Sequence, residues 1–158
     1  GGVLPAASQA ALGSGRLSTL KMAPMARAAA AVVTTVAIIK LSELLLLSSL
    51  PAHHSLAVLA VACVLQWAAL DGAVASFALA TLVSIGGPLC ELPFISLGCW
   101  HYIPDVADYF PFGPDSKWAA LSSLTGPCYF AVTTDAIALG QCFAVWEGGS
   151  GGGRGAGE

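Results

Sequence analysis

Four long apolar segments separated by short polar stretches dominate the chain. They cover residues 28–50, 55–70, 73 to about 98–100, and 118–146. A helix needs roughly 20 apolar residues to cross a hydrocarbon core of about 30 Å, and three of the segments are this long. The second is shorter but apolar throughout, and the Asp71-Gly72 turn separates it from the third. The pattern predicts an all-α, polytopic membrane helix bundle with four transmembrane helices.

Two of these segments contain residues that interrupt helices. The third holds Gly86-Gly87-Pro88 and the fourth holds Gly126-Pro127. Proline cannot donate a backbone hydrogen bond, which leaves a carbonyl one turn earlier without its helical partner. Broken helices are tolerated at membrane depth where protein or a polar cavity satisfies the freed groups. We therefore predict that the third and fourth helices are interrupted and face a common polar pocket.

The charged residues outside the segments indicate an orientation. Three basic residues and no acid precede the first segment, whereas the loop after the third segment carries three aspartates against one lysine. Because lysine and arginine mark the cytoplasmic-type side, we expect both termini and the Asp71 turn on that side. The acidic loop and His53-His54 are then expected on the other side.

The two ends of the chain differ in composition from the middle. Residues 1–27 are basic, free of acids and rich in alanine and serine, as in the remnant of an organelle transit peptide; an ordinary basic tail has the same composition. Residues 147–158 form a glycine-rich tail, which is expected to be flexible. The predicted transmembrane domain is thus residues 28–146.

Composition supports a membrane protein and excludes several functions. Of all residues 56% are hydrophobic and 9% are charged, whereas soluble domains average about 25% charged residues. The net charge is −3 and no basic patch is present, so nucleic acid is not an expected partner. The five cysteines contain no CxxC pair, which argues against zinc, and we interpret them as small buried residues.

Four ionisable residues fall inside the apolar segments: Lys40, Glu43, Glu91 and Asp135. Each costs about 2.5–3.5 kcal/mol at the centre of a bilayer even on lenient scales, so each should find a partner. Lys40 and Glu43 lie three residues apart and can neutralise each other on one helix, or form a polar spot on a cavity wall.

Glu91 and Asp135 follow the two glycine-proline interruptions. We expect them to line one polar pocket between the third and fourth helices, with Lys40 contributing, and to bind a ligand there. The alternative is that glycine and proline only kink the helices, while the acids accept hydrogen bonds from threonine, serine or the backbone.

His101 stands between Trp100 and Tyr102 at the end of the third segment. Such a cluster is typical of the aromatic belt at a membrane interface. The alternative for His101 and Trp100 is a ligand-binding role, towards a lipid headgroup or the magnesium of chlorophyll. No GxSxG, HExxH, P-loop or GxGxxG motif is present, so an enzyme is not expected.

The order of several motifs resembles the INSIG (insulin-induced gene) family of membrane proteins. The runs that carry the resemblance are IIKLSEL, LAVLAVACVLQWAALDGAVASFALATL, ISLGCWHYIPDV and LTGPCYFAVTTDAIALG, together with Trp118. The similarity covers roughly residues 28–146. It departs from the family in showing four spans where members have six, and in lacking the asparagine and arginine of the family's last helix. With its glutamate, GGPLCE looks closer to uncharacterised plant, algal and cyanobacterial relatives than to the animal members.

The resemblance implies a non-enzymatic protein that binds a lipid within the bilayer and holds a larger membrane protein. Animal members sit in the endoplasmic reticulum and bind oxysterols, whereas the relatives that this chain resembles would act in a plastid. We therefore expect a lipid, isoprenoid or pigment such as chlorophyll or carotenoid as ligand, with Asp71 in the turn as a partner-binding residue.

The expected location is the plastid thylakoid membrane, with the endoplasmic reticulum as the alternative. The expected function is to regulate or stabilise a larger membrane protein. The alternatives are an auxiliary structural subunit of a photosystem-type supercomplex, or an intramembrane enzyme or carrier that uses Glu91 and Asp135.

Overall fold

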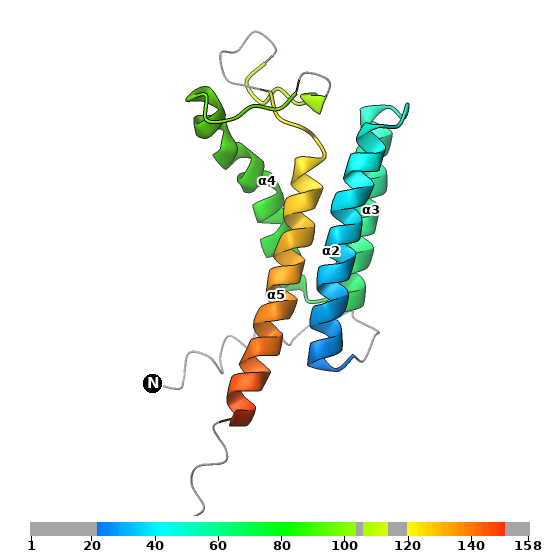
Figure 1. The fold of residues 1–158 in the computed structure, drawn as a ribbon, viewed down its shortest axis with the longest axis vertical. Helices are drawn as coiled ribbons and strands as arrows, with labels where there is room; N and C mark the ends of the chain where they lie inside the picture. The colour runs from blue at the N-terminus through cyan, green and yellow to red at the C-terminus, as the bar shows by residue number, and fades with distance from the viewer. Residues whose placement is uncertain (1–21, 104–105, 114–119, 151–158) are drawn as a thin grey trace, which may run out of the picture.

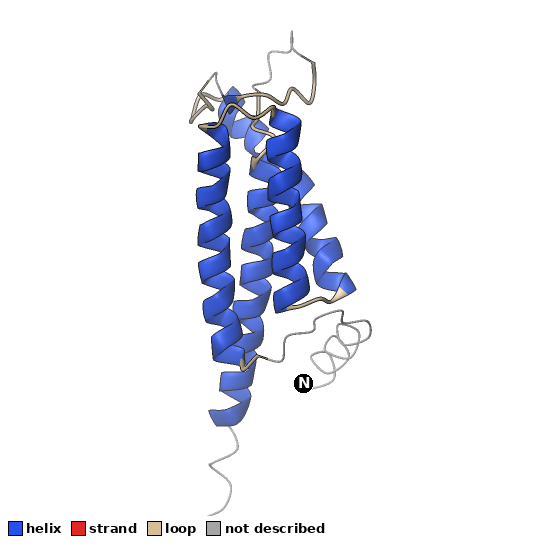
Figure 2. Ribbon diagram, turned by 90° about the vertical axis from the view of Figure 1, so that its right-hand side faces the viewer, coloured by secondary structure: helices blue, strands red, loops and turns tan. Residues whose placement is uncertain are grey.

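The computed structural model describes residues 22–103, 106–113 and 120–150, and this part of the chain is all-helical (Figures 1 and 2). The helices are α2 Pro24–Leu46, α3 Ala52–Leu70, α4 Val74–Ser96 and α5 Thr125–Ser150. Each is long and apolar enough to cross a membrane, α5 over Thr125–Gly148. The predicted fold, an all-α bundle with four candidate transmembrane helices, is confirmed, and the chain is an integral membrane protein.

Within the described residues, α5 packs against each of the other three helices. α4 lies along α5, and α2 packs against both α5 and α3, while α4 leans away from α3 as it rises towards the long loop (Figure 1). Gly72, with φ of 63°, allows the tight turn from α3 into α4. The start of α2, this turn and the late part of α5 meet at one end of the bundle through a hydrogen-bonded network. Which side of the membrane this end faces stays a prediction.

Two helices begin earlier than the sequence pattern predicts. α2 starts at Pro24, not at residue 28, because proline is favoured in the first helical turn, where its missing N–H has no helical partner anyway. It ends at Leu46, four residues before the predicted end. α3 starts at Ala52, so His53 and His54 belong to its first turn and not to a loop. Their rings stack at 4.2 Å between centroids.

The predicted interruption of the third helix is wrong. α4 runs without a break from Val74 to Ser96 and contains both Pro88 and Pro93. Pro88 cannot donate to the carbonyl of Ser84, four residues earlier. Gly126 of α5 lies directly against that carbonyl, since a Cβ on Gly126 would come within 2.9 Å of the Ser84 oxygen. The freed carbonyl therefore lies against the backbone of α5 at a residue without a side chain, so α4 continues where protein packs beside the lost bond.

The predicted interruption of the fourth helix is also wrong, for a different reason. α5 begins at Thr125, so Gly126 and Pro127 occupy its first turn. In the first turn the backbone N–H groups have no helical acceptors, and a proline there costs little. Residues 114–119, which include Trp118, lie outside the described residues. At its other end α5 continues through Ser150, into the segment predicted to be a flexible tail.

The core lies between α2, α3 and α5 and includes a row of aromatic side chains. Trp67 packs on Phe77 at 4.8 Å between ring centroids, and Phe77 packs edge-on against Phe130 at 5.5 Å. Arrangements of this kind contribute about 0.5–1.5 kcal/mol each beyond the area they bury. They tie the start of α4 to α3 and α5 at the network end of the bundle.

The loop between α4 and α5 is tied back onto the bundle. Tyr109 and Leu121 exchange two backbone hydrogen bonds, of 2.9 and 2.8 Å. The Asp108 carboxylate accepts bonds from the backbone N–H and the hydroxyl of Ser123, at 2.7 and 2.6 Å. Asp108 is thus a structural residue of this loop rather than only a solvated charge.

Candidate functional site

Glu91 lies where α4, the following loop and α5 meet. Its Oε2 accepts a hydrogen bond from the Tyr102 hydroxyl at 2.7 Å, and its Oε1 accepts one from the Tyr129 hydroxyl at 2.8 Å. The Tyr102 hydroxyl also lies 2.9 Å from Thr125 Oγ1. We call these four residues the Glu91 cluster. Both carboxylate oxygens are engaged by donors of the chain itself, which corresponds to the packing alternative.

Tyr102 is one of the three residues, Trp100 to Tyr102, that were predicted to form an aromatic belt at the membrane interface. Burial raises the pKa of its phenol above the ordinary range. The hydrogen bond with Thr125 lowers the pKa and Glu91 raises it, and the net pKa is raised, so the hydroxyl keeps the proton that it donates to Glu91. Trp100 packs edge-on against Tyr102 at 5.1 Å, and His101 between them is exposed. The headgroup and chlorophyll roles of His101 and Trp100 stay predictions.

Asp135 does not join the Glu91 cluster. It lies six residues beyond Tyr129 on α5, about 9 Å further along the helix axis. No hydrogen bond in the described residues connects it with Glu91, and its Oδ1 is buried without a hydrogen-bond partner. The predicted pocket that Glu91 and Asp135 would share is therefore not formed by these two side chains.

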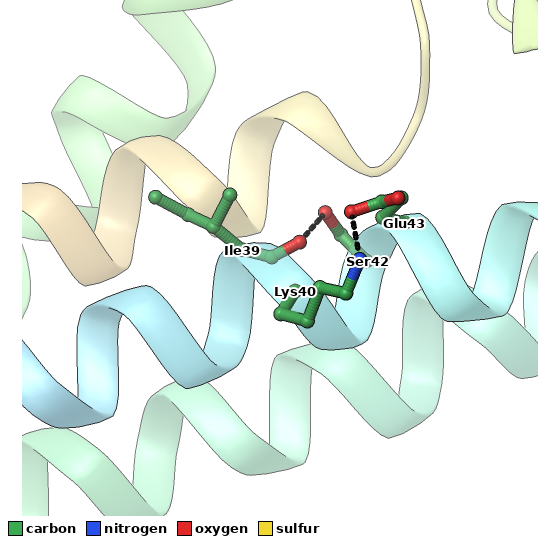
Figure 3. Close-up of polar contacts among 4 residues, drawn as sticks. All are labelled: Ile39, Lys40, Ser42 and Glu43. Carbon is green, nitrogen blue, oxygen red and sulfur yellow. Dashed lines mark hydrogen bonds and ion pairs between the residues drawn. The ribbon is translucent and has the colours of Figure 1, made fainter.

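Lys40 forms an ion pair with neither Glu91 nor Asp135 in the described residues. Its ammonium pairs with Glu43 Oε2 at 2.7 Å, one turn along α2, as expected from their spacing (Figure 3). Both side chains are largely exposed, at 61% and 58%. Ser42 turns back to donate a hydrogen bond to the Ile39 carbonyl at 2.7 Å. Lys40 is thus part of an outward-facing ion pair rather than a pocket lining.

A second polar network occupies the end of the bundle where α2 starts. Asp71 is only 2% exposed; its Oδ1 accepts from Gln141 Nε2 at 3.1 Å, and its Oδ2 accepts from the Ser76 hydroxyl. The Gln141 Oε1 in turn accepts from Arg27 Nη1 at 3.2 Å. The indole N–H of Trp67 donates to the Ala73 carbonyl at 3.0 Å, which positions the turn. We call Arg27, Asp71, Ser76 and Gln141 the Asp71 network.

The burial of Asp71 bears on its predicted role in partner binding. A side chain that is 98% enclosed has no surface for a partner to contact directly, so Asp71 would influence a partner only through the network that it anchors. Its contacts are those of an internal organising residue, which fixes Gln141 and Ser76 around one cavity.

That cavity lies between the start of α2, the start of α4 and the late part of α5. Its volume is about 690 Å³, within the range of roughly 300–1,000 Å³ typical of ligand pockets. The Asp71 network forms its polar wall, and the remainder of its lining is largely apolar. Leu79 and Val145 line it yet are 48% and 60% exposed, so the cavity opens between α4 and α5 towards the surroundings of the bundle.

Sequence reasoning missed most of this site. Arg27 was assigned to the basic tail of residues 1–27, whereas it lies in the first turn of α2. Gln141 carried a usable signal: it and Gln66 are the two glutamines inside the predicted spans, and polar amides in such helices usually bond between helices. Gln66 does so, donating to Thr34 and Thr35 of α2 at 3.0 and 2.8 Å.

The cysteines show no metal site among the described residues. No group of three His, Cys, Asp or Glu side chains there lies close enough to hold a metal ion, and the five cysteines are free. Of the five cysteines predicted to be buried, Cys63 and Cys142 are buried and Cys128 is half-buried. Cys90 and Cys99 are exposed, because they lie on the outer face and beyond the end of α4.

Comparison with known proteins adds no assignment. No family model, no curated protein and no solved structure matches the chain. The resemblance to the INSIG family therefore stays a prediction.

The difference between Asp135 and Asp71 leads to a prediction. Asp135→Leu should leave the free energy of unfolding unchanged or raise it, because no partner of its buried oxygen is lost and a polar group leaves the apolar interior. Asp71→Asn should lower it by about 1 kcal/mol, because one of its two acceptor oxygens becomes a donor. The measurement is denaturant-induced unfolding in detergent. A large loss for Asp135→Leu would show that this acid has a partner.

Proposed function

We propose that this chain is a non-enzymatic membrane protein that binds a lipid, isoprenoid or pigment between its helices and thereby regulates or stabilises a larger membrane protein. The observation that supports this proposal is the cavity of about 690 Å³ with one polar wall and largely apolar remaining walls. A site of this composition fits an amphiphile, whose polar end is recognised by a few side chains and whose chain is held by apolar contact.

The position of the cavity agrees with an amphiphile oriented as in a bilayer. Arg27 is the fourth residue of α2 and Asp71 lies in the turn, so the polar wall is at the end of the bundle. Leu79 lies five residues into α4, about 8 Å deeper. A headgroup at Arg27 therefore leaves its chain beside Leu79, at the opening towards the membrane.

Regulation would follow from what the ligand touches. It would contact α2, α4 and α5 together, and α4 is the helix that diverges most from the bundle. A bound molecule that has a higher affinity for one position of α4 would favour that position. The outer surface that α4 presents to a partner would then be fixed as well. We place the protein in a plastid, specifically the thylakoid membrane, on the composition of residues 1–27.

A second candidate function is that of an auxiliary structural subunit of a larger complex. Exposed aromatic side chains in the loop after α4 favour it, because aromatic residues are enriched at protein interfaces. They are Trp100, Tyr109, Phe110 and Phe112, each between 39% and 62% exposed. A subunit would remain in one large complex in mild detergent, whereas a regulator would exchange its partner and leave as a small particle with its ligand.

The cavity itself is tested by filling it. We expect Leu79→Trp, which places an indole at the opening, to remove most of the lipid that co-purifies with the protein in mild detergent. Leu82→Trp is the matched control, because Leu82 lies three residues further along α4, is 68% exposed and does not line the cavity. Mass spectrometry of the purified protein gives the amount of lipid retained. Equal retention by both variants would contradict the proposal.

A further inference from the structure

In the Asp71 network the acceptor atoms have partners, whereas most donors of Arg27 lack one among the described residues. Both oxygens of Asp71 accept bonds from the chain itself. Arg27 carries five N–H donors, and among the described residues it uses one of them, towards the neutral amide of Gln141. Its Nε is buried and has no hydrogen-bond partner in the described ranges. The unmet requirement in this wall of the cavity is therefore for an acceptor.

Within the described part of the chain, the charge of Arg27 is likewise not balanced by a direct ion pair. The ion pair found in the described part of the chain joins Lys40 to Glu43, remote from this cavity. Gln141 stands between Arg27 and Asp71 and bonds to both, so it holds the guanidinium in place without neutralising it. A positioned guanidinium whose other donors have no partner among the described residues is suited to a planar or tetrahedral oxyanion, which it binds through paired hydrogen bonds.

From these observations we infer that Arg27 recognises the anionic oxygens of a lipid headgroup, a phosphate or carboxylate group, whose chain lies along Leu79 and Ile137. The inference rests on the proposed function and adds to it the chemical class of the ligand. Gln141 acts as a positioning residue, because it fixes one nitrogen of Arg27 at the wall of the cavity and leaves the other donors available to a ligand. A zwitterionic or uncharged headgroup of similar size would lack the matching net charge.

The test compares lipids that differ in headgroup charge. The full chain is placed in nanodiscs of equal parts phosphatidylglycerol and phosphatidylcholine, extracted into mild detergent, and analysed by native mass spectrometry for bound lipid. We expect the unmodified protein to retain phosphatidylglycerol. Arg27→Gln should lower the preference for phosphatidylglycerol about tenfold, the effect of losing one charge-assisted contact. Lys40→Gln removes the same charge from an exposed position on α2 and should leave the preference unchanged.

Two further arms separate the possible sources of failure. Free inorganic phosphate added in excess should displace little of the bound lipid, because it lacks the apolar chain; complete displacement would show that the site takes the free anion and would overturn the lipid inference. If Arg27→Gln does not fold, Leu79→Trp replaces it, and it should remove phosphatidylglycerol while the network keeps its charge.

The outcomes distinguish this inference from the proposed function. Equal retention of phosphatidylcholine and phosphatidylglycerol by the unmodified protein would overturn the inference and leave an intramembrane lipid site in place. No retained lipid of either kind would overturn both. An unchanged preference in Arg27→Gln would show that another group selects the headgroup.

Discussion

Replacing Glu91 by leucine should lower the free energy of unfolding by about 3 kcal/mol or more, because two hydrogen bonds to a charged acceptor are lost at about 1.5–3 kcal/mol each. The two tyrosine hydroxyls that donate these bonds, from Tyr102 and Tyr129, are left without their acceptor. The measurement is denaturant-induced unfolding of the purified protein in detergent, followed by circular dichroism.

Glu43 provides the matched control for this change. It is also a membrane-segment glutamate, but it is exposed and paired with Lys40 on the surface of α2. Because exposed ion pairs contribute about 0–1 kcal/mol, Glu43→Leu should change stability little. Tyr102→Phe and Tyr129→Phe should each cost stability in the native background and cost less when Glu91 is already leucine, since they share its carboxylate.

The opposite result would restore the ligand-binding interpretation of Glu91. If Glu91→Leu kept the stability of the unmodified protein but lost its co-purifying lipid, the carboxylate would serve a ligand and the tyrosines would only orient it. If it lost stability and kept the lipid, the Glu91 cluster would be structural and the cavity at the Asp71 network would be the binding site.

The helices could be predicted from the sequence because each one corresponds to a single continuous run of apolar residues. Long apolar runs leave little alternative to a membrane helix, since every backbone group must be paired within the segment. The ends were less certain: Pro24 looked like part of a tail, although proline favours the first turn of a helix, and Gly126-Pro127 looked like an interruption although it is such a first turn.

The effect of Pro88 could not be predicted from the sequence of α4 alone. A proline in a helix frees one carbonyl, and whether the helix then breaks depends on what lies beside that carbonyl. Here it is Gly126 of α5, which lies 38 residues after Pro88 in the chain. The sequence shows both the proline and the glycine, but their juxtaposition depends on how α4 packs against α5.

The partners of the acids were hidden for a similar reason. The sequence identified Glu91 as a residue that needs partners, and the structure supplies two tyrosines from the loop and from α5. Arg27 and Gln141 are 114 residues apart, and the contact between them needs the first and last helices of the bundle to be neighbours. Composition and spacing carry no information about such a pairing.

The second large loss of stability that we expect comes from the glycines at the packing interface of α4 and α5. Gly126→Ala should lower the free energy of unfolding by about 1–3 kcal/mol, the usual cost of overpacking, because its Cβ would meet the Ser84 carbonyl at 2.9 Å and a backbone atom cannot turn aside. Gly87→Ala should act in the same direction, because its Cβ would lie 2.8 Å from the ring of Tyr129, which is itself held by Glu91.

Gly86 is the control that separates packing from helix propensity. It neighbours Gly87 in α4, but beyond the adjacent backbone of α4 no described atom lies within 4 Å of the Cβ that alanine would add. Alanine favours a helix over glycine by about 1 kcal/mol, so Gly86→Ala should raise the free energy of unfolding while Gly87→Ala lowers it. Unfolding of the three variants in one detergent compares them directly. If the substitutions at Gly86 and Gly87 change the free energy of unfolding in opposite directions, the difference comes from what faces each Cβ. Stabilisation by Gly126→Ala would instead show that α4 and α5 lie further apart and that the Ser84 carbonyl has another partner.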